Sequence, residues 1–282
     1  MQKSILIRKS NGEKVPFDET KLRSALLRSG ASETDIEHAI ERVYNILQEG
    51  ISTKTIYRYA YQALRKQSKR AAGRYRLKRA MLELGPSGYP FEKFIAKLLE
   101  TQGYKCTVNK IQQGKCVTHE LDVVAEKDNV KIMIECKYHS EADRKSDVKI
   151  PLYINSRFLD VKNVWEKENP HKVYKGMVVT NTRFSQDAVD YAKCEGLLLV
   201  SWDYPHTNSL KEQIDRAGLH PVTSLGLLKK TEKRELLENG IVLCRQLINN
   251  VAMLENMKIH RTRIKKIIDE AMEIIRQNNH TL

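Results

Sequence analysis

The sequence predicts an α/β fold for the middle of the chain and mainly helical segments on either side of it. Short apolar stretches with the length and composition of strands alternate there with turn formers and with one amphipathic segment, 185–194. The expected strands are 119–125, 132–137, 176–180 and 197–200. An amphipathic helix at 89–100 precedes them, with Phe91, Phe94 and Leu98 on one face. A helix, a hairpin and then strand–helix–strand predict an α/β/α arrangement around one central sheet.

The N-terminal segment has its own pattern of one hairpin and several helices. Residues 5–7 and 15–17 are expected to pair across an Asn11-Gly12 turn, a strong hairpin signal. Helices are expected from Asp18 to Ser29, after Ser32, from Thr53 or its neighbours, and over 74–81. The Gly- and Pro-containing stretch 84–88 separates this segment from the sheet. With helices but no strand pattern after 209, we expect three domains, 1–86, 87–208 and 209–282.

The composition favours a polyanionic partner and excludes several classes of protein. The 282 residues include 49 Lys and Arg against 35 Asp and Glu, a net charge of +14. The five cysteines are scattered without a CxxC pair, which argues against a disulfide framework and a zinc site. No stretch resembles a signal peptide or a membrane span, so a cytoplasmic location without membrane contact is expected. The phosphate-loop pattern GxxxxGK[ST] is absent, so ATP is not expected to serve as fuel.

The candidate catalytic residues lie on the first two strands of the expected sheet. Side chains alternate along a strand, so Glu135 and Lys137 share one face while Cys136 points to the other. A turn at 126–129 would bring Asp122 beside them. Two carboxylates beside an ammonium suit a divalent metal and an activated water. The alternative is that these charges form the solvated face of an edge strand.

The segment from Tyr89 to Trp202 resembles the PD-(D/E)xK nucleases, and among them the Mrr-type restriction endonucleases. The matching residues are Phe91-Glu92, Glu120-Leu121-Asp122, Glu135-Cys136-Lys137 and the stretch from Val179 to Ala192. The resemblance implies a restriction-endonuclease-like sheet in which Asp122 and Glu135 ligate Mg²⁺ or Mn²⁺. It also implies that Lys137 orients the attacking water or stabilises the developing charge, and that Glu92 lies near the metal.

The first 86 residues resemble the ATP-cone, a nucleotide-sensing domain. The matching residues are Ile7-x-Lys9-x-Asn11-Gly12, Val15-Pro16-Phe17-Asp18, Lys21-Leu22, 51–56 and 72–76. The resemblance implies ATP or dATP as a regulatory ligand, with Lys9 and Lys21 facing the phosphates and Thr53 helping to hold the nucleotide. The family usually has Arg directly after the first Lys, where this chain has Ser10. The choice between ATP and dATP therefore stays open.

Two basic or helical stretches allow more than one interpretation. The run 58–79 contains no acidic residue, and it could contact nucleotide phosphates, DNA or only solvent. Residues 236–247 resemble a helix-hairpin-helix element, whose backbone amides around a glycine bind phosphate. A structural helical cap or a dimerisation element explains these residues equally well.

These observations predict a metal-dependent DNA endonuclease, an Mrr-like hydrolase that restricts foreign or modified DNA and responds to ATP or dATP. Because cleavage of both strands needs two active sites, a homodimer is compatible with this function. One alternative is a nucleotide-responsive DNA-binding regulator with a non-catalytic nuclease fold. Another is a repair nuclease that acts on branched DNA.

Overall fold

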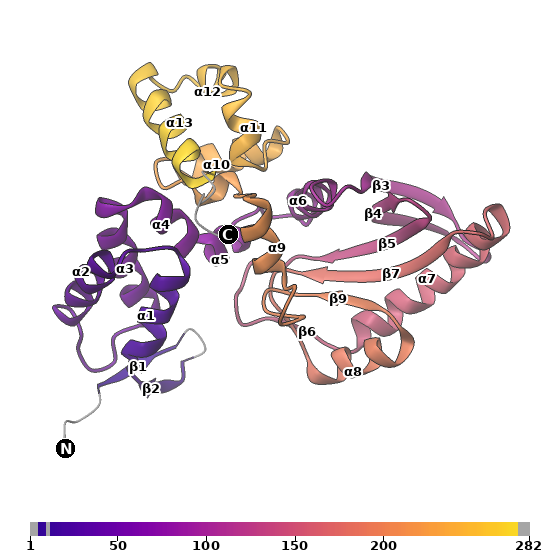
Figure 1. Cartoon of the computed structure of the whole chain (residues 1–282), viewed down its shortest axis with the longest axis horizontal. Coiled ribbons are helices and arrows are strands. Elements are labelled where there is room, and N and C mark those ends of the chain that lie inside the picture. Colours follow the sequence, from indigo (N-terminus) through magenta and orange to yellow (C-terminus); the bar gives the residue numbers. More distant parts are fainter. Residues whose placement is uncertain (1–4, 10–11, 276–282) are drawn as a thin grey trace. The chain divides into compact units, whose positions relative to one another are not determined.

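The computed structural model describes residues 5–9 and 12–275, and the described chain forms two compact units (Figure 1). The first unit combines the N-terminal residues up to 80 with 222–232 and 244–275. The second, which we call the sheet unit, contains 81–221 and 233–243. The two units therefore divide the C-terminal segment 209–282 between them, and its role as a separate domain stays a prediction. Within the described residues, no helix has the length and apolar character needed to cross a bilayer.

The sheet unit is built on one mixed five-stranded sheet with the order β3-β4-β5-β7-β9 (Figure 1). The first three strands are antiparallel, whereas β5, β7 and β9 run parallel. The strands are β3 (Lys105–Gln113), β4 (Thr118–Lys127), β5 (Val130–Lys137), β7 (Val173–Thr180) and β9 (Leu198–Val200). The β4–β5 turn lies at Asp128 and Asn129, inside the predicted stretch, and Asp128 has a φ of 51°. The predicted α/β fold is confirmed.

Helices cover the sheet, and one of them, α7 (Lys149–Glu168), was not predicted. α6 (Tyr89–Glu100) packs on β3 and β4 through Phe91, Phe94 and Leu98, as expected. α7 connects β5 to β7 and packs on the sheet through a core that includes Ile154, Phe158 and Trp165. Four further elements belong to the unit: α8 (Gln186–Glu195), which Ser185 caps as expected, α9 (Leu210–Ala217), and the short parallel strands β6 (Lys145–Ser146) and β8 (Arg183–Phe184).

The N-terminal part of the first unit contains the predicted hairpin and helices. β1 (Leu6–Arg8) pairs with β2 (Lys14–Pro16), although Ser10 and Asn11 of the expected turn lie outside the described residues. The next helices are α1 (Glu19–Arg28), α2 (Glu33–Tyr44) and α3 (Thr53–Gln67). Their N-caps are Asp18, Ser32 and Ser52, each of which accepts a hydrogen bond from a backbone N–H of the first turn.

The expected single helix over 74–81 is wrong in its bounds. The structure has two helices instead, α4 (Lys69–Tyr75) and α5 (Leu77–Leu82). α4 begins five residues earlier than expected because Ser68 caps it, accepting from Ala71 N. Arg76 ends α4, with its own N–H bonded to the carbonyl oxygens of Ala72 and Arg74. A capping serine two residues before an Arg- and Ala-rich run was the signal that sequence reasoning passed over.

C-terminal elements complete the first unit, and α13 packs on its N-terminal part. These elements are the 3₁₀ turn η1 (Val222–Ser224), α11 (Cys244–Ile248), α12 (Ala252–Asn256) and α13 (Arg261–Ile275). α10 (Lys230–Glu238) is divided between the units, and its residues 233–238 belong to the sheet unit. α13 packs against α4 so closely that a Cβ on Gly73 would lie 2.6 Å from Ile274 Cδ1. The buried carboxylate of Glu270 accepts hydrogen bonds from Gly226 N and Leu227 N, both at 3.0 Å. The region is helical, as predicted.

Candidate active site

The candidate site lies where β4 and β5 separate. Their backbone pairing runs from Lys127 opposite Val130 to Val123 opposite Ile134. One residue further along β4, the carboxylate of Asp122 accepts a hydrogen bond from Cys136 N at 2.7 Å. A side chain thus takes the place of a backbone acceptor at this point, which fixes the orientation of the Asp122 carboxylate. β5 itself continues to pair with β7 as far as Lys137 opposite Thr180.

Glu135 and Lys137 lie on the same face of β5, as their spacing predicts. Glu135 is buried, with 5% of its surface exposed, and Lys137 Nζ donates to its Oε1 at 2.5 Å. The other oxygen, Oε2, accepts from Arg157 Nη1 at 2.8 Å. Both carboxylate oxygens therefore have a cationic partner, and these two contacts offset the unfavourable burial of the charge.

Glu92 enters the same electrostatic environment from the first turn of α6. Burial, and then the charges of Asp122 and Glu135, raise the pKa of Glu92 to about 7. Burial, and then the charge of Glu135, raise the pKa of Asp122 to about 6, although the Cys136 N–H opposes the shift. The structure thus brings the four predicted residues together, and their negative charge exceeds what Lys137 and Arg157 neutralise.

Arg157 is the residue of this cluster that sequence reasoning missed. It lies on α7, and its second guanidinium nitrogen, Nη2, donates to the carbonyl oxygen of Glu120 on β4. The helix itself had a clear signal, because its inward residues Ile150, Ile154, Phe158, Val161 and Trp165 recur at helical spacing. The role of Arg157 had none, since no local pattern relates a helical arginine to a strand glutamate 22 positions earlier.

One turn after Arg157, Asp160 binds the β3–β4 hairpin to α7. Its carboxylate accepts from Cys116 N at 2.8 Å and from Val117 N at 3.3 Å. The ring of His119 lies 2.8 Å from Asp160 Oδ2, and this hydrogen bond is the main reason why the pKa of Asp160 falls to about 2. His119, which flanks the predicted site in sequence, therefore bonds to α7.

The end of β5 is fixed to the last two residues of α5. Asn181 is fully buried, and its amide accepts from His139 N at 2.8 Å while donating to the carbonyl oxygens of His139 at 2.7 Å and Met81 at 3.3 Å. The hydroxyl of Tyr138 donates to the carbonyl oxygen of Leu82 at 2.6 Å. The two residues that follow Lys137 are thus bound to the main chain at 81 and 82.

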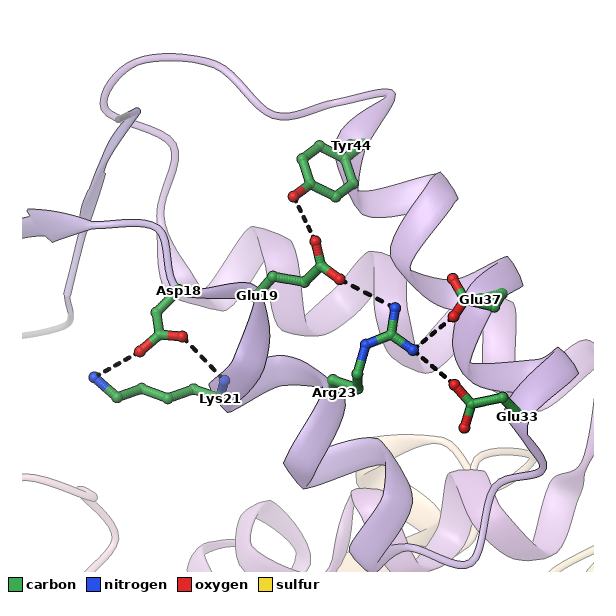
Figure 2. Close-up of polar contacts among 7 residues, drawn as sticks. All are labelled: Asp18, Glu19, Lys21, Arg23, Glu33, Glu37 and Tyr44. Carbon is green, nitrogen blue, oxygen red and sulfur yellow. Dashed lines mark hydrogen bonds and ion pairs between the residues drawn. The ribbon is translucent and has the colours of Figure 1, made fainter. Parts of the chain in front are cut away.

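The residues expected to bind a nucleotide lie around the hairpin and the starts of α1 and α3. Lys9 pairs with Glu13 at 3.0 Å, and Figure 2 shows Lys21 turned back on Asp18, with Nζ 3.2 Å from Oδ2. Thr53 is the first residue of α3. In the same view, Arg23 of α1 forms ion pairs with Glu33 and Glu37 of α2 and with Glu19 of its own helix. The Tyr44 hydroxyl donates a hydrogen bond to Glu19.

A cavity of about 480 Å³ opens beside Thr53. It forms where Arg8 of β1 meets Ser52, the residue that caps α3. The Arg58 guanidinium carbon lies 5.4 Å from the centre of the Tyr59 ring. The lining residues are Arg8, Ile46, Gln48, Ile51, Ser52, Thr55, Arg58 and Tyr59. Lys9, Lys21 and Thr53 are not among them.

Comparison with known proteins identifies the parts of the chain. The model of the ATP cone domain matches residues 5–82, and a model described as a restriction endonuclease, of the Mrr catalytic type, matches 85–203. A third, described as AF1548-like, C-terminal, matches 220–275. Both predicted resemblances are therefore confirmed, in the predicted order.

Two relatives extend this comparison. An uncharacterized protein of Archaeoglobus fulgidus is 35% identical over 182 residues, which are 64% of this chain and 99% of the relative. The crystal structure of a protein of unknown function, AF1548, is 34% identical with a TM-score of 0.55, and the match covers 67% of this chain and 98% of that one. The chain thus belongs to the AF1548-like family and joins an ATP-cone domain to a restriction-endonuclease domain of the Mrr type.

Proposed function

We propose that this protein is a metal-dependent DNA endonuclease whose activity responds to ATP or dATP. The observation that carries this proposal is the cluster of Asp122, Glu135 and Lys137 where β4 and β5 separate. It supports phosphodiester hydrolysis because carboxylates, an ammonium and a restriction-endonuclease domain coincide. The net charge of +14 favours a nucleic acid as substrate.

The donor set fits Mg²⁺ or Mn²⁺. Asp122 and Glu135 supply oxygen ligands, and the pKa of Asp122, raised to about 6 by burial and by Glu135, indicates uncompensated negative charge that a cation would neutralise. Within residues 5–9 and 12–275, no group of three His, Cys, Asp or Glu side chains is arranged to hold a metal ion. The proposed site therefore relies on two carboxylates, and Mg²⁺ commonly takes one or two carboxylates and completes its shell with waters and substrate phosphate.

The roles of the side chains follow from their chemistry. The cation, held by Asp122 and Glu135, would supply Lewis-acid polarisation of the phosphate and acidification of a water. Lys137 would orient the attacking water or stabilise negative charge on the phosphate oxygens. Burial and the neighbouring carboxylates raise the pKa of Glu92 to about 7. Glu92 is therefore suited to exchanging a proton at neutral pH.

For the nucleotide we propose the cavity between β1 and α3. Its volume of about 480 Å³ is within the range of small-molecule sites. Arg8 and Arg58 offer guanidinium groups for phosphates, and Tyr59 offers a ring on which a base can stack. Lys9, Lys21 and Thr53 stay predicted nucleotide ligands. Arg58→Ala and Lys21→Ala should each weaken ATP and dATP binding in calorimetry, whereas Lys66→Ala, on the exposed face of α3, should not.

Plasmid cleavage tests the catalytic proposal. Supercoiled plasmid, methylated or unmethylated, is incubated with Mg²⁺ or Mn²⁺, with and without ATP or dATP. We expect metal-dependent nicking or linearisation that is lost in Glu135→Gln and Lys137→Ala and retained in Glu168→Gln, which removes an exposed charge at the end of α7. Equal cleavage by Glu135→Gln would contradict the site, and a preference for methylated plasmid would favour the restriction role.

A second candidate is a DNA-binding regulator with a non-catalytic nuclease fold. It is favoured by one observation: Lys137 and Arg157 already occupy both oxygens of Glu135. Nucleotide-dependent DNA binding without cleavage under any metal condition would support it. Cleavage of branched but not of linear duplex DNA would instead indicate a repair nuclease.

A further inference from the structure

Arg157 holds the carboxylate oxygen of Glu135 that Lys137 leaves free. Its guanidinium is largely buried, with 12% of the side chain exposed, and it lies 2.8 Å from Glu135 Oε2. Any cation that binds through this oxygen must take it from Arg157. We propose that Arg157 sets the affinity of the site for divalent cations, by competing with the metal for Glu135. The inference rests on the proposed function, since it assumes that Asp122 and Glu135 hold the metal.

The second contact of Arg157 keeps its charge in place. Nη2 donates to the carbonyl oxygen of Glu120, so the guanidinium bridges β4 and β5. If Nη1 releases Glu135, the Nη2 contact still retains the side chain beside the site. The positive charge therefore opposes a bound cation even after the ion pair has opened.

The helix that carries Arg157 is fixed as well. Asp160, one turn further on, accepts from the N–H groups of Cys116 and Val117 and bonds to His119. The main-chain carbonyl of Asp160 also accepts from Lys115 N at 3.0 Å. α7 is thus bound to the β3–β4 hairpin directly beside Arg157. The guanidinium cannot follow a displaced Glu135 by a shift of the helix without breaking these contacts.

The charges around the site determine the direction of the effect. Three carboxylates, those of Glu92, Asp122 and Glu135, interact there with two cationic side chains, Lys137 and Arg157. Loss of one cation increases the net negative charge and frees Glu135 Oε2. A divalent cation should then bind more tightly, although the protein loses a hydrogen-bonded ion pair. A residue whose role was only structural would have the opposite effect, because a disordered Glu135 binds metal less well.

The test is a titration of the full-length protein with Mn²⁺ in the absence of DNA, with free Mn²⁺ measured by electron paramagnetic resonance. We expect Arg157→Gln to bind Mn²⁺ about tenfold more tightly than the wild type. Arg157→Lys keeps the charge but cannot bridge Glu135 and Glu120, so its affinity should lie between the two. Lys162→Gln removes a positive charge from the same helix, where Lys162 pairs with Glu166 at 3.4 Å, and should leave the affinity unchanged.

Each outcome has one interpretation. Mn²⁺ affinity that is equal to or weaker than that of the wild type in both Arg157 variants would overturn the inference. If Arg157→Gln does not fold, the comparison of Arg157→Lys with the wild type decides alone, since only competition predicts tighter binding. Asp122→Asn separates the two proposals. If this variant binds Mn²⁺ as tightly as the wild type does, the metal site of the proposed function fails. If binding depends on Asp122 but not on Arg157, only the inference fails.

Discussion

Asp122→Asn should stabilise the metal-free protein, because it removes a carboxylate that the fold destabilises. Burial and the charge of Glu135 raise the pKa of Asp122 from its ordinary 3.8 to about 6. The folded state therefore holds this proton more tightly than the unfolded state does. The free energy of unfolding therefore falls as the pH rises from the unfolded-state pKa of 3.8 to the folded-state pKa of about 6, and above this interval it falls no further on account of Asp122. Asparagine does not titrate, and its side-chain oxygen still accepts the hydrogen bond from Cys136 N.

The size of the effect follows from the size of the pKa shift. The rise from 3.8 to about 6 corresponds to about 3 kcal/mol at neutral and higher pH. Because the side chain is only partly buried and water screens part of the repulsion, we expect about half of this, ~1.5 kcal/mol at pH 8. At pH 5, between the two pKa values, the gain should itself fall to about half of its value at pH 8.

Urea unfolding followed by tryptophan fluorescence measures the difference in the free energy of unfolding between the wild type and Asp122→Asn, and it reports on the sheet unit. The chain has 2 tryptophans, Trp165 and Trp202, and both lie in the sheet unit. Wild type and Asp122→Asn are compared with EDTA present at pH 5 and pH 8, with Asp190→Asn on the exposed face of α8 as the control. A variant less stable than the wild type at pH 8, or a gain that does not change with pH, would refute the reasoning.

Three further changes test other contacts of the fold. Asp160→Ala should free the hairpin tip at 114–117, which hydrogen exchange of its amides would show as faster exchange; unchanged rates would mean that other contacts hold the tip. Glu270→Ala leaves two N–H groups without their acceptor and should lower the free energy of unfolding by about 2–4 kcal/mol, measured by calorimetry. A loss below about 1 kcal/mol would mean that water replaces the carboxylate. Gly73→Ala should lower the free energy of unfolding by about 1–3 kcal/mol, because its Cβ would lie 2.6 Å from Ile274 Cδ1, and the double variant with Ile274→Ala should lose less than the sum of the two single losses. A single variant as stable as the wild type would contradict this close packing.

Strong local signals predicted most elements of the fold correctly. α1, α6 and α8 were expected at the right places because each combines a periodic apolar face with a clear start or stop signal. The pairing of β4 with β5 followed from two apolar stretches and the polar turn between them. β3 was missed because it is an edge strand rich in Lys, Asn and Gln. The apolar Ile111 lies on its exposed side, which breaks the alternation of apolar and polar residues along the strand.

The candidate site was predictable only where its residues are close in sequence. The spacing of Glu135 and Lys137 places them on one face of a strand whatever the rest of the fold does. Arg157 reaches the site from α7, and its contact with Glu135 depends on how that helix packs on the sheet. The cavity near Thr53 likewise depends on β1 lying beside the start of α3, a tertiary contact that no short pattern encodes.

The packing of α13 on α4 has a consequence for the order in which the protein acquires its structure during translation. The ribosome makes α4 early and α13 only after all five strands of the sheet. Until then, the α4 surface around Gly73 lacks the helix that covers it in the native state. The first unit therefore stays incomplete while the ribosome synthesises the strands of the sheet. A stop codon placed after the sheet should leave a truncated product whose first unit is more sensitive to protease than the same unit in the full-length chain.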